Sequence, residues 1–245
     1  LDQYGVPEFL NKRDAFLFKM YQAFGHHFDF IAIPIIKKRL RMDTSQVIIN
    51  EERPQLTKHL ATRFKEKIGQ NVNLLGEVVL GNEEADHRYH HYLEALESPD
   101  INYISVKISG IYAQTHALNY EESFPELVSR MSALYQKAID FPYTDEDGIK
   151  RSKFINLDME EYKDAHFTLR LFKAVLNLPQ FKNYSAGIVV QAYLPDAYDF
   201  QTELLEFAKA RVDGGGAPIK MRLVKGCNLE METVISSLKG WPNPI

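Results

Sequence analysis

Charged and amide side chains occur within or directly after short apolar segments of the sequence, where a buried strand would carry mainly apolar residues. Six such side chains recur, mostly toward the C-terminal ends of five segments: Glu77, Lys107, Asp158, Gln191, Arg222 and Lys225. Lysine and glutamate are almost never buried without a partner, because an isolated charge is costly to desolvate. One charge could face water on an edge strand, but recurrence in every segment indicates a functional cluster.

The chemistry of these six side chains favours an anionic ligand. Three are cations, two are carboxylates and one is an amide. Lysine and arginine form charge-assisted hydrogen bonds with anionic groups, and the two carboxylates would balance the positive charge. A structural interpretation stays open beside this one, because Glu–Lys or Asp–Arg pairs can serve the fold alone.

The elements that position these side chains follow from hydrophobic periodicity. Five short apolar runs are typical of strands buried on both faces: Asn73–Leu80, Tyr103–Ser109, Phe154–Asp158, Gly187–Ala192 and Ile219–Val224. Helical stretches follow them in turn: Glu83–Leu96, Phe124–Ile139, Asp164–Leu176, Phe200–Ala210 and Leu229–Leu238. This alternation predicts a parallel α/β sheet. Ligands bind at the carboxyl ends of such strands, so the polar side chains are expected to converge there.

Periodicity leaves two architectures open, a barrel of which five strand–helix units are present and an open, doubly wound sheet. Residues 1–72 show helical spacing instead, and we predict a helical region there, followed by the α/β domain from 73 to 245. The segment 143–151 is polar, and an exposed loop is expected.

Bulk composition excludes several classes of protein. The 245 residues carry a formal net charge of -4, which gives no basic footprint for a nucleic acid. No apolar run approaches the roughly 20 residues that cross a bilayer. The single cysteine, Cys227, excludes an intramolecular disulfide framework.

Three further motifs favour no chemistry. Gly214–Gly216 precedes a predicted strand, whereas a dinucleotide-binding glycine motif follows a strand and opens a helix. His87 and His91 share a helix face but lack the glutamate of a zinc-protease HExxH motif, so we predict no metal. Cys227 has no partner motif, and a role as nucleophile is not favoured.

Five sequence motifs resemble successive motifs of the proline dehydrogenase domain of the bifunctional proline-utilisation flavoproteins. They are NLLGE (73–77), SVKIS (105–109), NLDMEEY (156–162), VVQAYL (189–194) and MRLVKG (221–226), in the order that the family has them. The resemblance implies a (βα)₈ TIM-type barrel that binds FAD at its C-terminal face. It implies oxidation of L-proline to 1-pyrroline-5-carboxylate, with hydride passing to the flavin and electrons to membrane quinone.

The resemblance also assigns a role to each polar side chain at the strand ends. Lys107 would contact the proline carboxylate, and Asp158 would lie near flavin and substrate and help to hold the Lys107 ammonium. Arg222 would lie near the flavin N5 and tune hydride acceptance. These three form the predicted catalytic set.

Cofactor contacts and a gate complete the implied site. Gln191 would hydrogen-bond the flavin ring system, and Lys225 and Gly226 would contact the ribityl or phosphate portion of FAD. Glu77 would pair with an arginine that gates the substrate, although no segment here matches the arginine pair of the family. A cytoplasmic location, peripheral contact with the inner membrane and a homo-oligomer also fit the family.

The five units predict a C-terminally incomplete copy of the domain, which would bind FAD and oxidise proline poorly. Two other functions stay open. A Schiff-base barrel enzyme would use Lys107 or Lys225 as its nucleophile. Alternatively, residues 1–72 would be an interaction arm on an inert scaffold.

Overall fold

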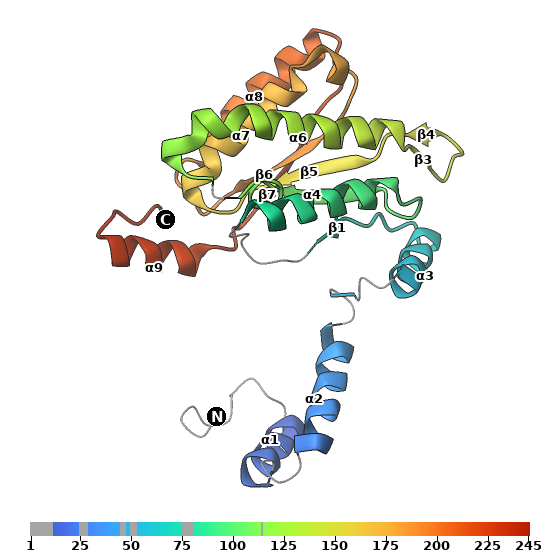
Figure 1. Ribbon diagram of the computed structural model, residues 1–245, viewed down its shortest axis with the longest axis vertical. Coiled ribbons are helices and arrows are strands. Elements are labelled where there is room, and N and C mark those ends of the chain that lie inside the picture. The colour runs from blue at the N-terminus through green and yellow to red at the C-terminus, as the bar shows by residue number, and fades with distance from the viewer. Residues whose placement is uncertain (1–11, 25–28, 45–47, 50–52, 75–80, 114) are drawn as a thin grey trace. The chain divides into compact units, whose positions relative to one another are not determined.

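The computed structural model describes residues 12–24, 29–44, 48–49, 53–74, 81–113 and 115–245. The chain forms two compact units, Leu1–His59 and Leu60–Ile245. Helices α1 (Lys12–Phe24) and α2 (Asp29–Thr44) belong to the first unit, and α3 (Arg53–Lys65) spans the division (Figure 1). All three fall within the region predicted to be helical, while a domain boundary at residue 72 stays a prediction.

A parallel sheet of five strands forms the centre of the second unit. Its strands are β1 (Val72–Asn73), β2 (Tyr103–Lys107), β5 (Phe154–Asp158), β6 (Gly187–Gln191) and β7 (Lys220–Val224). They are arranged in the order β1-β2-β5-β6-β7, so every strand lies beside its predecessor in the sheet. A doubly wound sheet reverses its order at a switch point, whereas a barrel does not. The order therefore selects the barrel-type arrangement from the two that periodicity allowed.

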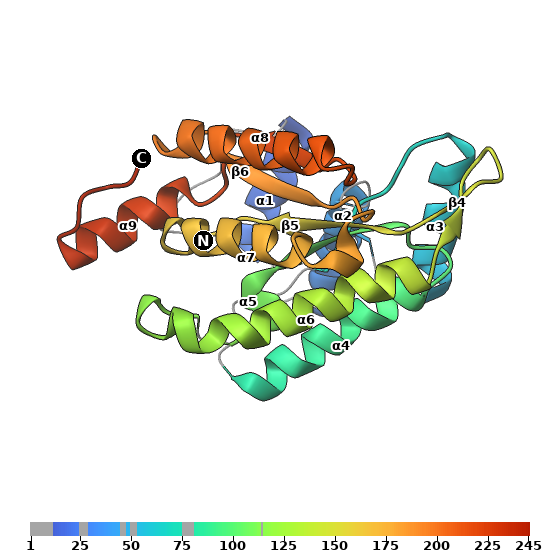
Figure 2. The ribbon, with the colours of Figure 1, turned by 90° about the horizontal axis from the view of Figure 1, so that it is seen from above.

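Helices connect these strands and lie side by side. Figure 2 shows a row formed by α4 (Asn82–Glu97), α6 (Tyr120–Asp140), α7 (Ala165–Leu176) and α8 (Ala197–Asp213). Helix α9 (Leu229–Lys239) follows β7. All five predicted helices of this unit are present, and α6 begins four residues before its predicted start at Phe124.

Alternate residues of the strands differ in chemistry. One set is apolar and 0% exposed: Ile104, Val106, Ile155, Leu157, Ile188 and Val190. Leu134 of α6 and Phe172 of α7 are among the buried side chains that complete this core. The intervening positions carry Ser105, Lys107, Asn156, Asp158 and Gln191, together with the apolar Val189. Because side chains alternate between the faces of a strand, the sheet has one apolar face and one polar face.

The strand predictions need two local corrections. Strand β2 ends at Lys107 instead of Ser109, because the chain turns there into the short helix α5 (Ile108–Ile111). Strand β1 is described only at Val72–Asn73, and residues 75–80 of the first predicted run lie outside the described residues. The other three strands lie within one residue of their predicted limits.

The segment predicted to be an exposed polar loop contains a short hairpin. Strands β3 (Tyr143–Thr144) and β4 (Lys150–Arg151) pair antiparallel outside the main sheet. Asp145 organises the turn, because its Oδ1 accepts hydrogen bonds from the backbone N–H groups of Asp147 (3.0 Å) and Ile149 (2.9 Å). A side chain that satisfies two turn amides explains how so polar a segment stays ordered.

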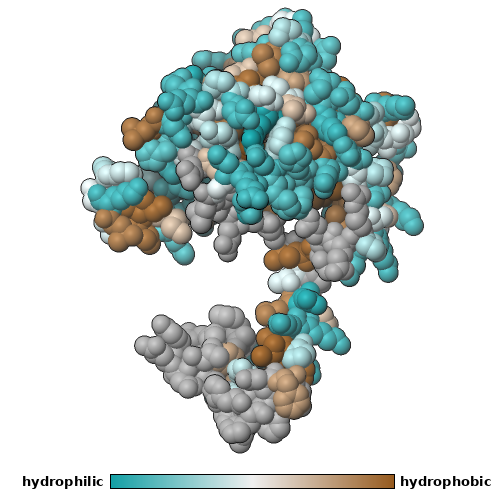
Figure 3. Space-filling model, in the orientation of Figure 1, coloured by the Kyte–Doolittle hydropathy of each residue, from teal (hydrophilic) through white to brown (hydrophobic). Residues whose placement is uncertain are grey.

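Surface chemistry separates α9 from the rest of the second unit. The face of this unit that Figure 3 shows is mainly hydrophilic, whereas apolar side chains gather where α9 lies. Exposed apolar residues of α9 are Leu229, Met231, Val234 and Leu238. None of the helices in the described ranges combines the length and apolarity needed to cross a membrane.

Candidate active site

Polar side chains meet at the carboxyl edge of the sheet because of strand register. Lys107 is the last residue of β2 and lies opposite Asp158, the last residue of β5. Gln191 ends β6, and Arg222 lies on β7 beside Val189 of β6. The predicted convergence of these four strand residues is thus present in the fold.

Asp158 accepts several hydrogen bonds from the polar side chains around it. One of its oxygens, Oδ1, accepts hydrogen bonds from Ser105 Oγ (3.2 Å), Asn156 Nδ2 (2.7 Å) and Arg222 Nη2 (2.6 Å). Asn71, just before β1, donates in turn to Ser105 Oγ (2.9 Å). The three bonds to Asp158 lie on the polar face, and within the described part of the chain no hydrogen bond to Oδ2 is present.

Burial and hydrogen bonding act in opposite directions on the Asp158 carboxyl. Desolvation raises the pKa of Asp158, and the nearby Arg222 guanidinium and the bonds from Ser105 and Asn156 only partly offset it. The carboxyl therefore holds its proton to a higher pH than an exposed aspartate. It is still the partner of a guanidinium, so the site combines a costly buried acid with the cation that stabilises its charge.

The ion-pair partner of Lys107 is Glu160, which the sequence analysis did not single out. Lys107 Nζ lies 2.9 Å from Glu160 Oε1, and Ser109 Oγ donates to Glu160 Oε2. The family resemblance assigned support of this ammonium to Asp158, whose own ion pair is with Arg222. Glu160 follows β5 by two residues, and a carboxylate just beyond a strand end was the signal available in the sequence.

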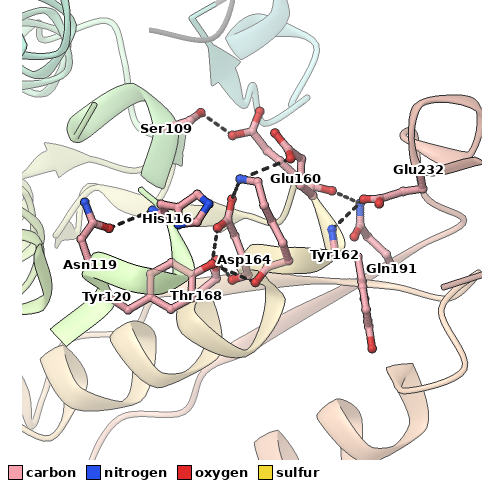
Figure 4. A network of polar contacts seen from close by, with 12 residues as sticks. Ser109, His116, Asn119, Tyr120, Glu160, Tyr162, Asp164, Thr168, Gln191 and Glu232 are labelled. Carbon is pink, nitrogen blue, oxygen red and sulfur yellow. Dashed lines mark hydrogen bonds and ion pairs between the residues drawn. The ribbon is translucent and has the colours of Figure 1, made fainter. Parts of the chain in front are cut away.

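Gln191 is held from one side only. Its side chain is 1% exposed, and Nε2 donates to the backbone carbonyl of Glu160 (3.0 Å; Figure 4). The opposite atom, Oε1, is buried and has no hydrogen-bond partner among the described residues. Arg222 Nε is likewise buried and unpartnered. Buried polar atoms are nearly always satisfied, so this acceptor and this donor suit complementary polar groups of a ligand.

The turn after β7 brings Lys225 and Gly226 to the same edge. The Lys225 side chain is exposed, and its backbone carbonyl accepts from Tyr193 N–H (3.0 Å). Gly226 has a φ of 117°, and an added Cβ would lie 1.4 Å from Tyr193 Cδ1. Only glycine fits both the backbone angle and the ring that lies against it.

Helix α9 is tied to this region by another residue that sequence reasoning missed. Glu232 is 8% exposed, and its Oε1 accepts from Tyr162 N–H (2.7 Å) at the start of the 3₁₀ helix η3 (Tyr162–Asp164; Figure 4). The Tyr162 hydroxyl donates to Asp196 Oδ2 (2.7 Å), just before α8. A buried carboxylate thus satisfies a backbone donor beside the site.

The remaining predicted residues occupy ordinary positions or are not described. Glu77 lies outside the described residues. His87 and His91 share a face of α4, with ring centroids 4.3 Å apart. Gly214 caps the C-terminus of α8, as expected for a turn before β7, and Cys227 is exposed.

A sequentially ordered parallel sheet with a cation–carboxylate cluster at its carboxyl edge defines an α/β barrel protein whose ligand site is built from strand ends. The chain belongs to the proline dehydrogenase family, whose sequence model matches residues 56–245. No curated protein matches it significantly.

Solved structures agree with this family and with the barrel fold. Proline utilization A (PutA) from Corynebacterium freiburgense is 36% identical, with a TM-score of 0.76 over 97% of this chain. PutA from Bdellovibrio bacteriovorus, inactivated by N-propargylglycine, is 30% identical, with a TM-score of 0.73 over 86% of this chain. A PutA mutant from Bradyrhizobium japonicum, 24% identical with a TM-score of 0.61 over 71% of this chain, shares the fold.

The chain spans only part of these proteins. It covers 23% of the Corynebacterium freiburgense and Bdellovibrio bacteriovorus structures and 18% of the Bradyrhizobium japonicum structure.

The TM-scores of these matches confirm the predicted barrel fold.

Proposed function

We propose that this chain forms part of the active site of a proline dehydrogenase that oxidises L-proline to 1-pyrroline-5-carboxylate with FAD. The observation that carries the proposal is the convergence of Lys107, Asp158, Gln191 and Arg222 at one edge of the sheet. Electrons would pass onward to a quinone, which accounts for the expected peripheral contact with a membrane.

The strand ends fit a flavin. Its ring system carries an N–H donor and several nitrogen and carbonyl acceptors. Gln191 Oε1 is a buried acceptor without a partner, and Arg222 Nε is a buried donor without one. The exposed ammonium of Lys225 suits the phosphate portion of FAD. When bound, FAD would supply the acceptor for two electrons, and the protein would supply binding and orientation.

Lys107 is suited to the substrate carboxylate. Its ammonium has three donors, and the structure gives one ion pair, to Glu160, so donors remain for a second anion. Oxidation of proline removes a hydride from the ring carbon next to the nitrogen that does not carry the carboxylate. The nitrogen loses a proton, and a C=N bond forms between these two atoms. The carboxylate does not react, so it serves as the handle by which Lys107 orients the ring.

Asp158 and Arg222 complete the proposed site. Asp158 fixes the Arg222 guanidinium through Oδ1 and keeps Oδ2 for a donor on substrate or cofactor. Arg222 would then supply positive charge to a bound flavin, which gains electrons when it oxidises the substrate. The assigned gating role of Glu77 stays a prediction, because that residue lies outside the described residues.

An absorbance experiment tests this function directly. The purified chain is mixed with FAD, desalted, and then treated with L-proline without oxygen. Flavin that is retained and bleached by proline would establish the activity. Flavin that stays oxidised would reject proline oxidation by this chain alone while keeping FAD binding, and loss of flavin on desalting would reject both FAD binding and proline oxidation by this chain alone.

The Schiff-base alternative predicts a different outcome. Borohydride would trap a carbonyl substrate on Lys107 or Lys225, and the adduct would appear by mass spectrometry without any flavin. The ion pair between Lys107 and Glu160 favours anion binding over this chemistry.

A further inference from the structure

Glu160 links two strands of the proposed active site. Its carboxylate pairs with Lys107 at the end of β2 (2.9 Å), and its backbone carbonyl accepts from Gln191 at the end of β6 (3.0 Å). The residue itself lies just after β5, the strand between these two in the sheet. One residue therefore contacts both neighbours of its own strand.

The Glu160 carboxylate is itself restrained. Ser109 Oγ, in the first turn of α5, donates to Oε2 while Lys107 engages Oε1. Both oxygens are thus occupied by residues from the β2–α5 segment, and the Glu160 side chain is 25% exposed. A carboxylate held at both oxygens can fix the position of its partner cation.

Lysine needs such a restraint to bind an anion in one orientation. Its flexible stem loses considerable rotamer entropy when the ammonium is confined, and the Lys107 side chain is 30% exposed. An ammonium already held by Glu160 has lost part of this freedom before a ligand arrives, which reduces the entropic cost of binding.

We propose that Glu160 is a positioning residue that holds the Lys107 ammonium for the carboxylate of the substrate. The proposal rests on the proposed function for the identity of the substrate, but the ion pair can be tested without it. An opposite effect is conceivable, because a carboxylate beside Lys107 also competes with an incoming carboxylate. The two effects predict opposite changes in proline affinity when Glu160 loses its charge.

The first test measures the ammonium without any ligand. Lysine is labelled with ¹⁵N, and the side-chain ammonium signal of Lys107 is assigned by its loss in Lys107→Met. In Glu160→Gln this signal is expected to weaken or disappear through faster exchange with water, because its carboxylate partner is gone. Glu161→Gln is the matched control, since Glu161 pairs with Lys163 (3.2 Å) and the charge change is the same. An unchanged Lys107 signal in Glu160→Gln would overturn the proposal.

The second test measures proline in the FAD-loaded chain. Glu160→Gln is expected to raise KM about fivefold, the factor that a partly exposed ion pair of roughly 1 kcal/mol represents, with little change in kcat. The same substitution in a Lys107→Met background is expected to add nothing, because the group that Glu160 positions is absent.

Outcomes of the two tests separate the two proposals. A lower KM in Glu160→Gln would overturn positioning and show that Glu160 competes with substrate for Lys107. An equal effect in both backgrounds would show a structural role only. If the wild-type chain never reduces flavin but its Lys107 signal depends on Glu160, the proposed function fails while the positioning of Lys107 stands.

Discussion

The two faces of the same sheet are both buried but differ in the polarity of their side chains. On one face, Ile104, Val106, Ile155, Leu157, Ile188 and Val190 are all 0% exposed. On the other, Ser105, Asn156, Asp158 and Gln191 are also nearly or fully buried, yet every one of them is polar. Burial is common to both faces, so burial alone does not tell a core from a site. What differs is the kind of contact, because the side chains of the apolar face only pack, whereas those of the polar face form directed hydrogen bonds to one another.

The largest expected effect is on the apolar face. Leu157→Ala removes a fully buried side chain and leaves a cavity, which should lower the free energy of unfolding by about 2–5 kcal/mol. Urea denaturation measures it, with Leu205→Ala on α8 as the control, because Leu205 is 54% exposed. Equal losses in the two variants would contradict the division between the faces.

The next effect is on the polar face and concerns binding. Arg222→Met removes the partner of Asp158 and a buried donor, and FAD affinity should fall about ten- to a hundredfold, as for loss of a charged hydrogen bond. Fluorescence titration with FAD measures the change. Lys220→Met is the matched control, because Lys220 lies on the same face of β7 but at its N-terminal end, away from the proposed site. Comparable loss of affinity in both variants would argue against a site at the carboxyl edge.

A smaller effect on the free energy of unfolding depends on pH and comes from Lys153, directly before β5. Lys153 is 1% exposed, its ammonium donates to the Ser98 carbonyl, and burial lowers its pKa to about 8. The folded chain thus releases this proton near pH 8, whereas the unfolded chain keeps it to a pKa near 10.4. Between these two pKa values the unfolded chain binds the proton and the folded chain does not, so raising the pH stabilises the folded chain. The free energy of unfolding should increase by about 1 kcal/mol between pH 7 and 9. Thermal unfolding should show this rise in the wild type but not in Lys153→Met.

The smallest effect tests whether the polar face contributes to stability. Ser105→Ala deletes the hydroxyl that donates to Asp158 and accepts from Asn71. We expect a loss of about 0.5–1.5 kcal/mol, typical of one intramolecular hydrogen bond. The pKa of Asp158 should rise further, because the Ser105 bond lowers it. A loss as large as that of Leu157→Ala would show that the two faces contribute alike.

Much of the fold could be predicted from local patterns, because each strand and helix carries its own period. The ends of β5 at Phe154 and Asp158 coincide with the apolar run that predicts it. The convergence of Lys107, Asp158 and Gln191 followed from the general rule for parallel strands.

Contacts that depend on neighbouring segments could not be read in this way. Lys107 pairs with Glu160 because the register of β2 on β5 brings a residue beyond the strand into reach, and no spacing within the chain encodes that register. Gly226 could be assigned to a turn, but its approach to the Tyr193 ring depends on how β6 and β7 end together.

The position of β7 at the end of the strand order has a consequence for assembly of the sheet. Among the described strands it pairs with β6 alone, and Leu223 on it is 57% exposed. An edge strand of this kind is a template, because its outer N–H and C=O groups point where a further strand would lie. Strand β7 is already ordered against β6, so a further parallel segment would meet an ordered partner and bear only its own loss of entropy.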